Sequence, residues 1–331
     1  MKGCFAVWVA LLAAAAWGQD GAPVFRATSE LVLLDVQVIH NKTNTAMGQL
    51  QARDFELSED GVPQKISFFD RDQLPLSVVL LFDLTDSVRG VLHRLAAGAQ
   101  AALDHLKPGD EVAVMVYAAS AQLVDGFTRD RARAAAAVAR AAAMKSRDAA
   151  FFNEAVYQAA AHLDNSANPS SRRVILWLTD NLPNVPTGFN LRMHDRGLGG
   201  APPHTEEEAI RKLHESGTVV MPLLLKDRVA AVWAEMVIAG ESPYRKKYPP
   251  GDAHKYAELT GGFAAGMRGK EVEERLAEDI DNLRGRYTIG YRPTEEKPPG
   301  TFCRLKVALA PGAPLRPQEW RVLARAGYYR R

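Results

Sequence analysis

Two apolar runs constrain the fold of this chain more than any other feature of its sequence. Residues 76–82 and 174–178 consist almost wholly of large apolar side chains and do not alternate with polar ones. Such runs are typical of the central strands of a parallel sheet, because helices cover both faces of that sheet. Helical patterns alternate with these runs from Leu76 onward, so the sequence predicts an α/β fold with a mainly parallel open sheet flanked by helices.

The elements of this α/β region follow from the spacing of its apolar residues. We expect helices near residues 88–106, 129–145, 153–163, 205–216, 228–239 and 270–283, and strands at 111–117, 173–179 and 218–225, with a shorter strand after Gly262. The alanine-rich stretch at 129–145 is predicted to be a helix rather than a linker, with Thr128 as its N-cap.

Extended segments flank the α/β region on both sides. Residues 31–39 alternate polar with apolar side chains in their second half, and a tight turn at 59–61 joins two further strands. The segments 286–291, 302–309 and 320–328 are also extended, and turns rich in proline and glycine separate them. We expect the N- and C-terminal segments to pack together as one small β unit.

The chain is thereby divided into four parts. Residues 1–18 are predicted to be a signal peptide, because Lys2 precedes an apolar stretch that ends in a small-x-small cleavage pattern. An N-terminal β segment at 24–72, the α/β domain at 76–284 and a C-terminal β segment at 286–331 follow. No later stretch has the ~20 apolar residues that a membrane span needs. We therefore expect an exported protein, periplasmic or secreted, with no integral membrane span.

Charge and cysteine content exclude two further classes of protein. The 331 residues carry a formal net charge of +2, which argues against a dedicated nucleic-acid surface. Cys4 would leave with the signal peptide, so Cys303 would stand alone and no internal disulfide could form. We expect Cys303 to be a buried apolar residue on the strand face that it shares with Leu305.

Side chains with oxygen atoms stand where the two apolar runs end. Residues 83–87 read Asp-Leu-Thr-Asp-Ser, and Asp180 follows the second run. Ligands of open parallel sheets bind at the carboxyl edge, and carboxylate and hydroxyl oxygens suit a hard divalent cation. Asp83, Thr85, Ser87 and Asp180 are therefore the candidate metal ligands. The first motif alone could equally be a capped strand-to-helix turn, but the second carboxylate favours a metal site.

These motifs resemble those of the von Willebrand factor A family. The metal-ion-dependent adhesion site of that family combines D-x-S-x-S, a distant Thr, and an Asp after a later strand. The resemblance implies that Asp83, Thr85 and Ser87 fill the D-x-S-x-S positions and that Asp180 is the later carboxylate. It also implies Mg²⁺ (or Mn²⁺) as the cofactor and an accessible acidic residue of a partner protein as the remaining ligand.

The chain departs from the family pattern at the distant Thr. Ala150 stands nearest to that position, so water or Asp148 would have to supply the missing oxygen. The resemblance covers about residues 76–284, and the flanking β segments resemble those of exported proteins of this kind in Acidobacteria.

The resulting prediction is an exported, non-enzymatic protein-interaction or adhesion module that binds a partner carboxylate through a divalent metal. The long connections at 181–204 and 240–252 would select the partner. The alternative is a metal-independent structural scaffold that uses these loops directly. A metal-dependent hydrolase ranks third, because the chain has no D-x-D-x-T, G-x-S-x-G, Walker or H-E-x-x-H motif. His194 and His204 have no ligand-spaced partner and are expected to be surface residues rather than zinc ligands.

Overall fold

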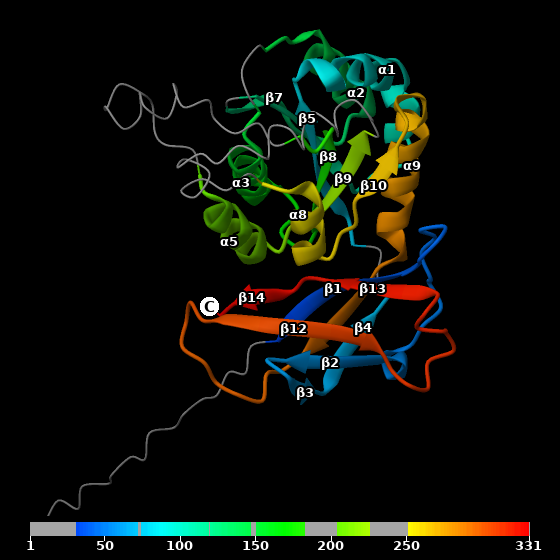
Figure 1. Cartoon of the computed structure of the whole chain (residues 1–331), viewed down its shortest axis with the longest axis vertical. Helices are drawn as coiled ribbons and strands as arrows, with labels where there is room; N and C mark the ends of the chain where they lie inside the picture. Colours follow the sequence, from blue (N-terminus) through cyan, green and yellow to red (C-terminus); the bar gives the residue numbers. More distant parts are fainter. Residues whose placement is uncertain are drawn as a thin grey trace, which may run out of the picture.

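The protein is built from two parts that are stacked along its long axis. A computed structural model describes residues 31–71, 74–118, 120–146, 150–182, 204–225 and 251–330. Figure 1 shows an α/β domain, in which helices cover a sheet, above a β unit made of strands from both ends of the chain. The α/β domain comprises the elements from β5 to α9, and the β unit comprises β1–β4 and β11–β14.

The described part of the α/β domain contains a six-stranded sheet in the order β10-β9-β8-β5-β6-β7. Its strands are β5 (Leu76–Asp83), β6 (Glu111–Tyr117), β7 (Ala121–Thr128), β8 (Arg172–Thr179), β9 (Val219–Leu225) and β10 (Ala265–Met267). Neighbouring strands are parallel except for β7, which pairs with β6 in antiparallel orientation at one edge. The predicted fold class is confirmed, although β7 was not predicted.

Helices cover both faces of this sheet. They are α1 (Asp86–Leu103), α2 (Arg131–Ala143), α3 (Phe152–His162), α5 (Glu206–Ser216), α8 (Ala253–Thr260) and α9 (Val272–Asn282). The buried residues of α1, α2 and α9 belong to one core cluster, and those of α3, α5 and α8 belong to a second. The sheet therefore lies between two hydrophobic cores, which explains why its central strands are apolar throughout.

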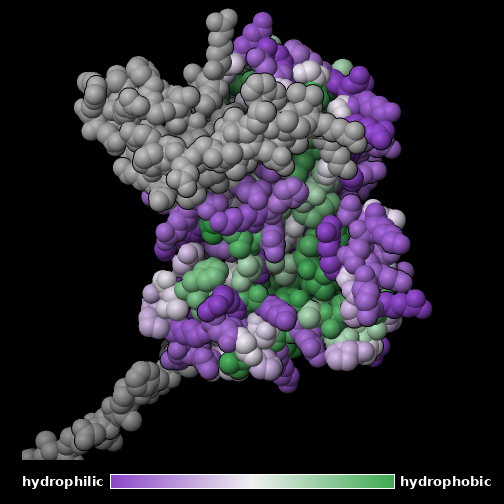
Figure 2. Space-filling model, in the orientation of Figure 1, coloured by the Kyte–Doolittle hydropathy of each residue, from purple (hydrophilic) through white to green (hydrophobic). Residues whose placement is uncertain are grey.

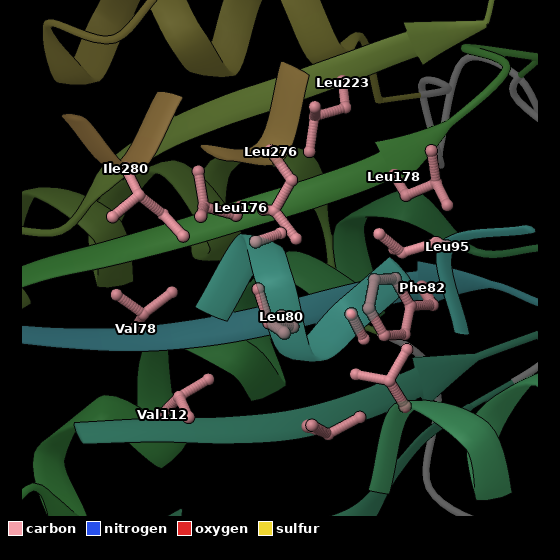
Figure 3. Packing of buried hydrophobic residues seen from close by; sticks show 14 of the residues in the cluster. Val78, Leu80, Phe82, Leu95, Val112, Leu176, Leu178, Leu223, Leu276 and Ile280 are labelled. Atoms are coloured by element: carbon pink, nitrogen blue, oxygen red, sulfur yellow. The ribbon is translucent and has the colours of Figure 1, made fainter. Parts of the chain in front are cut away.

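Strand β5 shows how one run of residues serves both cores. Side chains alternate across a strand, so Val78, Leu80 and Phe82 face α1 and α9, while Val79 and Leu81 face the other core. Figure 3 shows the first of these cores, where Leu276 and Ile280 of α9 point toward the sheet and Leu176 and Leu178 of β8 belong to the same cluster as the side chains of β5.

The predicted N-cap of α2 was wrong by two residues. Thr128 is still part of β7, and its hydroxyl accepts a hydrogen bond from the Asp130 N–H at 3.1 Å. Asp130 is the N-cap, because its carboxylate accepts from the Arg133 N–H at 3.0 Å. The strand extends further than its polar sequence indicated, so the helix starts later.

The β unit consists of two four-stranded sheets with the orders β13-β1-β11-β4 and β14-β12-β2-β3. Its strands are β1 (Val32–His40), β2 (Phe55–Glu59), β3 (Val62–Gln64), β4 (Ile66–Asp70), β11 (Tyr287–Tyr291), β12 (Phe302–Leu309), β13 (Trp320–Ala324) and β14 (Gly327–Tyr329). Strand β1 pairs with β11 and β13, and β2 pairs with β12. The predicted union of the two terminal segments is confirmed. The segment predicted as one strand at 320–328 divides into β13 and β14, which belong to different sheets.

A buried ion-pair cluster joins the β unit to the α/β domain. Asp35 of β1 contacts Arg172 at the start of β8 (2.8 Å) and Arg286 just before β11 (2.5 Å). Arg286 is fully buried and also donates to the Gln37 side chain at 3.0 Å and to the Gly261 carbonyl at 2.7 Å. Figure 2 shows hydrophobic residues gathered across the middle of the visible face, at the level of this junction. The β unit is therefore docked on the amino-terminal edge of the sheet.

Several predicted features lie outside the described residues. They are the signal peptide at 1–18, the helix at 228–239, and most of the long connections at 181–204 and 240–252. Within the described residues, no helix combines the length and the apolar character needed to cross a membrane.

Candidate functional site

The carboxyl ends of β5 and β8 lie side by side. The two strands are parallel neighbours, and Phe82 is in register with Leu178. Asp83 therefore ends β5 next to Thr179, and Asp180 follows directly. The chain enters α1 within three residues of Asp83, which brings Ser87 to the same edge. The structure thus gathers the four predicted site residues from segments almost 100 positions apart.

Asp83 lies at the inner end of this group and is fully buried. Its Oδ1 accepts from the Thr85 N–H at 2.8 Å, and its Oδ2 accepts from the Tyr117 hydroxyl at 2.8 Å. The Thr179 hydroxyl also donates to Oδ2, at 3.4 Å. These donors fix the orientation of the carboxylate and stabilise its charged form.

Burial nevertheless works against the charge of Asp83. The pKa of Asp83 rises from 3.8 to about 6; desolvation is the largest cause of this rise, and the nearby negative charge of Asp180 contributes to it. The hydrogen bonds from Thr85 and Tyr117 act in the opposite direction. A buried carboxylate beside a second carboxylate is an arrangement that a divalent cation would stabilise.

The other three side chains form a connected row of oxygen atoms. The Ser87 hydroxyl donates to Asp180 Oδ2 at 2.5 Å, and the hydroxyls of Thr85 and Ser87 lie 3.2 Å apart. Asp180 Oδ1 accepts from the Leu182 N–H at 2.9 Å, which leaves Oδ2 turned toward Ser87. Thr85 and Asp180 are half-buried and Ser87 is exposed, so this row lies nearer to solvent than Asp83.

This set of donors fits a hard cation in its chemistry. Two carboxylates and two hydroxyls converge, all through oxygen, which is the ligand type that Mg²⁺ and Mn²⁺ prefer. A cation bound here would have to replace the hydrogen bond between Ser87 and Asp180. The site still lacks the threonine of the family pattern. Ala150 stands nearest to that position, is buried in the core that contains Tyr117, and offers no side-chain oxygen. Asp148, the proposed substitute, lies outside the described residues.

The sequence did not predict the role of Tyr117 and Trp177, the residues behind the Asp83 carboxylate. Tyr117 ends β6, next to β5, and its hydroxyl accepts from Trp177 Nε1 at 3.0 Å while it donates to Asp83. Burial raises the pKa of Tyr117 well above its usual value, so the hydroxyl stays protonated and remains a donor. The only signal in the sequence was a tyrosine and a tryptophan within otherwise aliphatic strands, and core packing explains that equally well.

A small hollow adjoins the site on the β6 side. It has a volume of about 180 Å³ and lies between the ends of β5, β6 and α2. Leu84 and Met144 contribute apolar surface, and Gln122 and Lys145 contribute polar surface. The hollow is large enough for one side chain of a bound molecule.

Contacts within the fold account for two other residues discussed above, His204 and Cys303. The His204 Nδ1–H donates a hydrogen bond to Glu154 Oε2 at 2.7 Å, and the ring stacks on Tyr157, with ring centroids 3.5 Å apart. Cys303 is fully buried, as predicted. It lies close to Glu59 and Asp60, but both carboxylates contact the Lys297 ammonium, at 3.6 and 2.5 Å, so that cluster already holds a cation. His194 lies outside the described residues.

The match to a protein family decides how this edge is classified. Residues 78–182 match the family model of the von Willebrand factor type A domain. This stretch is similar to the domains of that family. The matched range includes all four predicted site residues, and the resemblance inferred from their motifs is confirmed. Domains of this family generally act as protein-interaction modules, which is the coarse function that the match supports.

The matches among solved structures have low sequence identity. The chain is similar to the conserved hypothetical protein BatB from Bacteroides thetaiotaomicron, with 15% identity, a TM-score of 0.42, and coverage of 63% of this chain and 98% of that chain. It is also similar to a von Willebrand factor type A protein from Catenulispora acidiphila, with 13% identity, a TM-score of 0.43, and coverage of 91% and 75%. Comparison with curated proteins gives no match.

Proposed function

We propose that this chain is a non-enzymatic interaction module that captures an acidic group of a partner protein through a divalent metal ion. The metal would be held at the carboxyl edge of the sheet by Asp83, Thr85, Ser87 and Asp180. The observation that carries the proposal is the convergence of two carboxylates and two hydroxyls from β5, α1 and β8 in a domain of this family.

The four residues would divide the work according to their burial. Ser87 and Asp180, nearer to solvent, would contact the cation or its bound waters, and Thr85 would supply a second hydroxyl. Asp83 is held by the Thr85 N–H and the Tyr117 hydroxyl, so it would supply negative charge at the base of the site. When bound, Mg²⁺ would provide the positive charge that attracts a partner's carboxylate.

Water would complete the coordination at the position where Ala150 replaces the family's threonine. Mg²⁺ usually keeps several waters beside one or two carboxylates, so the loss of one hydroxyl lowers affinity without excluding binding. The hollow lined by Leu84, Met144 and Lys145 would receive the side chain next to the partner's acidic residue.

The localisation of the protein is also part of this proposal. We propose export to the periplasm or the cell exterior, on the basis of the signal-peptide pattern at residues 1–18. An exported interaction module would meet divalent cations and the surfaces of other proteins, which suits a metal-dependent site.

Acetate is a suitable probe for this function, because it carries the proposed carboxylate and nothing else. We expect acetate to shift the amide NMR resonances of Thr85, Ser87 and Leu182 in the presence of Mg²⁺ but not in the presence of a chelator. Acetamide, the neutral control, should have no such effect. Shifts of equal size with chelator or with acetamide would contradict the proposal.

A metal-independent scaffold is the second candidate, and the buried Ala150 is the observation that favours it. In that case the α/β domain would present its long connections directly to a partner. Partner binding would then survive both chelation and the Asp83→Ala change, whereas the metal-dependent function predicts that either treatment abolishes it.

A further inference from the structure

Asn181, the residue after Asp180, has an unusual backbone conformation. Its φ is +55°, in the left-handed region that side chains other than glycine seldom adopt. Asparagine tolerates this region better than most residues, but the conformation persists only where surrounding contacts hold it. The contacts of Asn181 therefore indicate what the conformation achieves.

The side chain of Asn181 bridges the end of β8 and the start of α8. Its Oδ1 accepts from the Ala253 N–H at 2.9 Å, and its Nδ2 donates to Asp252 Oδ1 at 3.2 Å. Asp252 is the N-cap of α8, and its carboxylate accepts from the His254 N–H at 2.9 Å. Both ends of the Asn181 amide are thus used, each by a residue at the beginning of one helix.

The backbone of Asn181 completes the arrangement around Asp180. The Asn181 N–H donates to the Thr179 hydroxyl at 3.1 Å, and that hydroxyl donates to Asp83. The sharp turn at Asn181 also places the Leu182 N–H within 2.9 Å of Asp180 Oδ1. Asp180 Oδ2 is left facing Ser87, at 2.5 Å.

We infer that Asn181 is a positioning residue of the candidate metal site, which aims Asp180 at Ser87 by fastening the chain after β8 to the start of α8. The inference rests on the proposed function for its effect on metal binding, whereas the fastening itself concerns the protein alone. A consequence is that any displacement of α8 would move Asp180, so that α8 and the metal site are mechanically coupled.

The test uses Asn181→Gly in the full mature chain. Glycine adopts the left-handed conformation without strain, so the variant removes the two side-chain hydrogen bonds and keeps the backbone turn accessible. Asn44→Gly is the matched control, because Asn44 has a φ of +56° and lies in the β unit, away from the site. Asp252→Asn is a second control, since it keeps an oxygen that can accept from Asn181 and cap α8.

Two readouts separate this inference from the proposed function. In chelator, hydrogen exchange of the Leu182 and Ala253 amides should become at least several-fold faster in Asn181→Gly and should stay unchanged in both controls. In calorimetric titrations, Asn181→Gly should lower the affinity for Mg²⁺ about tenfold, the usual effect of losing a residue that orients a metal ligand.

Each outcome has one meaning. Unchanged exchange at Leu182 and Ala253 in Asn181→Gly would overturn the fastening role, whatever the metal does. Faster exchange with unchanged Mg²⁺ affinity would overturn the positioning role. If the wild-type chain does not bind Mg²⁺ at all, the proposed function fails, while the exchange data still decide whether Asn181 fastens β8 to α8.

Discussion

Asp83 combines two properties that conflict in the absence of a cation. It is fully buried, and it lies near a second carboxylate, Asp180. Three donors partly offset this cost: the Thr85 N–H and the hydroxyls of Tyr117 and Thr179. A residue of this kind reduces the stability of the metal-free fold, which is typical of residues retained for a site rather than for packing.

A pH dependence of stability follows from the raised pKa of Asp83. Because that pKa rises from 3.8 to about 6 on folding, the folded protein holds the proton more tightly, and stability is lost as the pH rises from about 4 to 6. In chelator at pH 7.5, Asp83→Asn should therefore be more stable than wild type by up to about 3 kcal/mol. Urea unfolding at pH 4 and pH 7.5 checks this, and an equal difference at both pH values would contradict it.

Tyr117 should matter more to the site than an equally buried tyrosine elsewhere. Tyr117→Phe removes the hydroxyl that donates to Asp83 and should weaken Mg²⁺ binding roughly tenfold, since it is the closest side-chain donor to the buried carboxylate. Tyr287→Phe is the matched control, because Tyr287 is equally buried, lies in the β unit, and has a hydroxyl that donates to the Met47 carbonyl at 2.6 Å. Calorimetric titration of both variants is the measurement, and similar losses would show that Tyr117 acts only through stability.

The sequence predicted the outer residues of the site but not their support. Asp83 and Asp180 were identifiable because each follows an apolar run, and the ends of parallel strands meet at one edge. Tyr117 could not be assigned, because its role depends on β6 lying directly next to β5, and a tyrosine at the end of an apolar strand is also a common core residue. Asn181 gave no signal, since its left-handed backbone becomes visible only in the structure.

Among the elements, helix α9 places a carboxyl group, that of Asp279, on its buried face. Asp279 is almost completely buried on the face of α9 that meets the core, and its Oδ1 has no hydrogen-bond partner among the described residues. Burial raises the pKa of Asp279 to about 7, while Arg275, 4.0 Å away, lowers it. At neutral pH the packing of α9 therefore includes a carboxyl group that is partly protonated.

Asp279→Asn should stabilise the protein at high pH. The folded pKa is above the unfolded value of 3.8, so wild-type stability declines as the pH rises toward 7, and the neutral amide avoids that decline. We expect a gain of about 2 to 4 kcal/mol at pH 8 and little difference at pH 4. Thermal unfolding at the two pH values checks this. Asp281→Asn, on the exposed side of α9, should show neither effect.

Local patterns predicted most elements, and failed where the tertiary context decides. The strands with continuous apolar runs, such as β5 and β8, were identifiable because both of their faces are buried. Strand β7 could not be predicted because it is an edge strand, and Gln122, Asp125 and Gly126 interrupt its apolar pattern. For the same reason the helix that follows was given Thr128 as its cap instead of Asp130.

At the scale of the whole molecule, the contact between the β unit and the α/β domain includes one carboxylate, that of Asp35, which pairs with two arginines. Arg172 and Arg286 are buried and both contact Asp35, whose side chain is 23% exposed. A carboxylate between two guanidinium groups cannot be removed without leaving like charges next to each other in the interior. Asp35 therefore links the β unit to the α/β domain through its contact with Arg172.

Asp35→Asn should destabilise the whole chain by about 3 kcal/mol or more, the usual consequence of breaking a buried ion pair. Asp70→Asn is the control, because Asp70 is exposed on β4 of the same sheet. Urea unfolding followed by tryptophan fluorescence is suitable, since Trp177 lies in the α/β domain and Trp320 in the β unit. A loss of stability no larger than that of the control would contradict the role of this cluster.

Direct titration of metal is the measurement that tests the central claim. Mg²⁺ and Mn²⁺ would be titrated calorimetrically into the chelator-treated mature chain and, in parallel, into Asp83→Ala. We predict saturable binding of about one ion per chain in the wild type, and none in a folded Asp83→Ala variant. The absence of binding in both proteins, or equal binding in both, would contradict a metal site at the ends of β5 and β8.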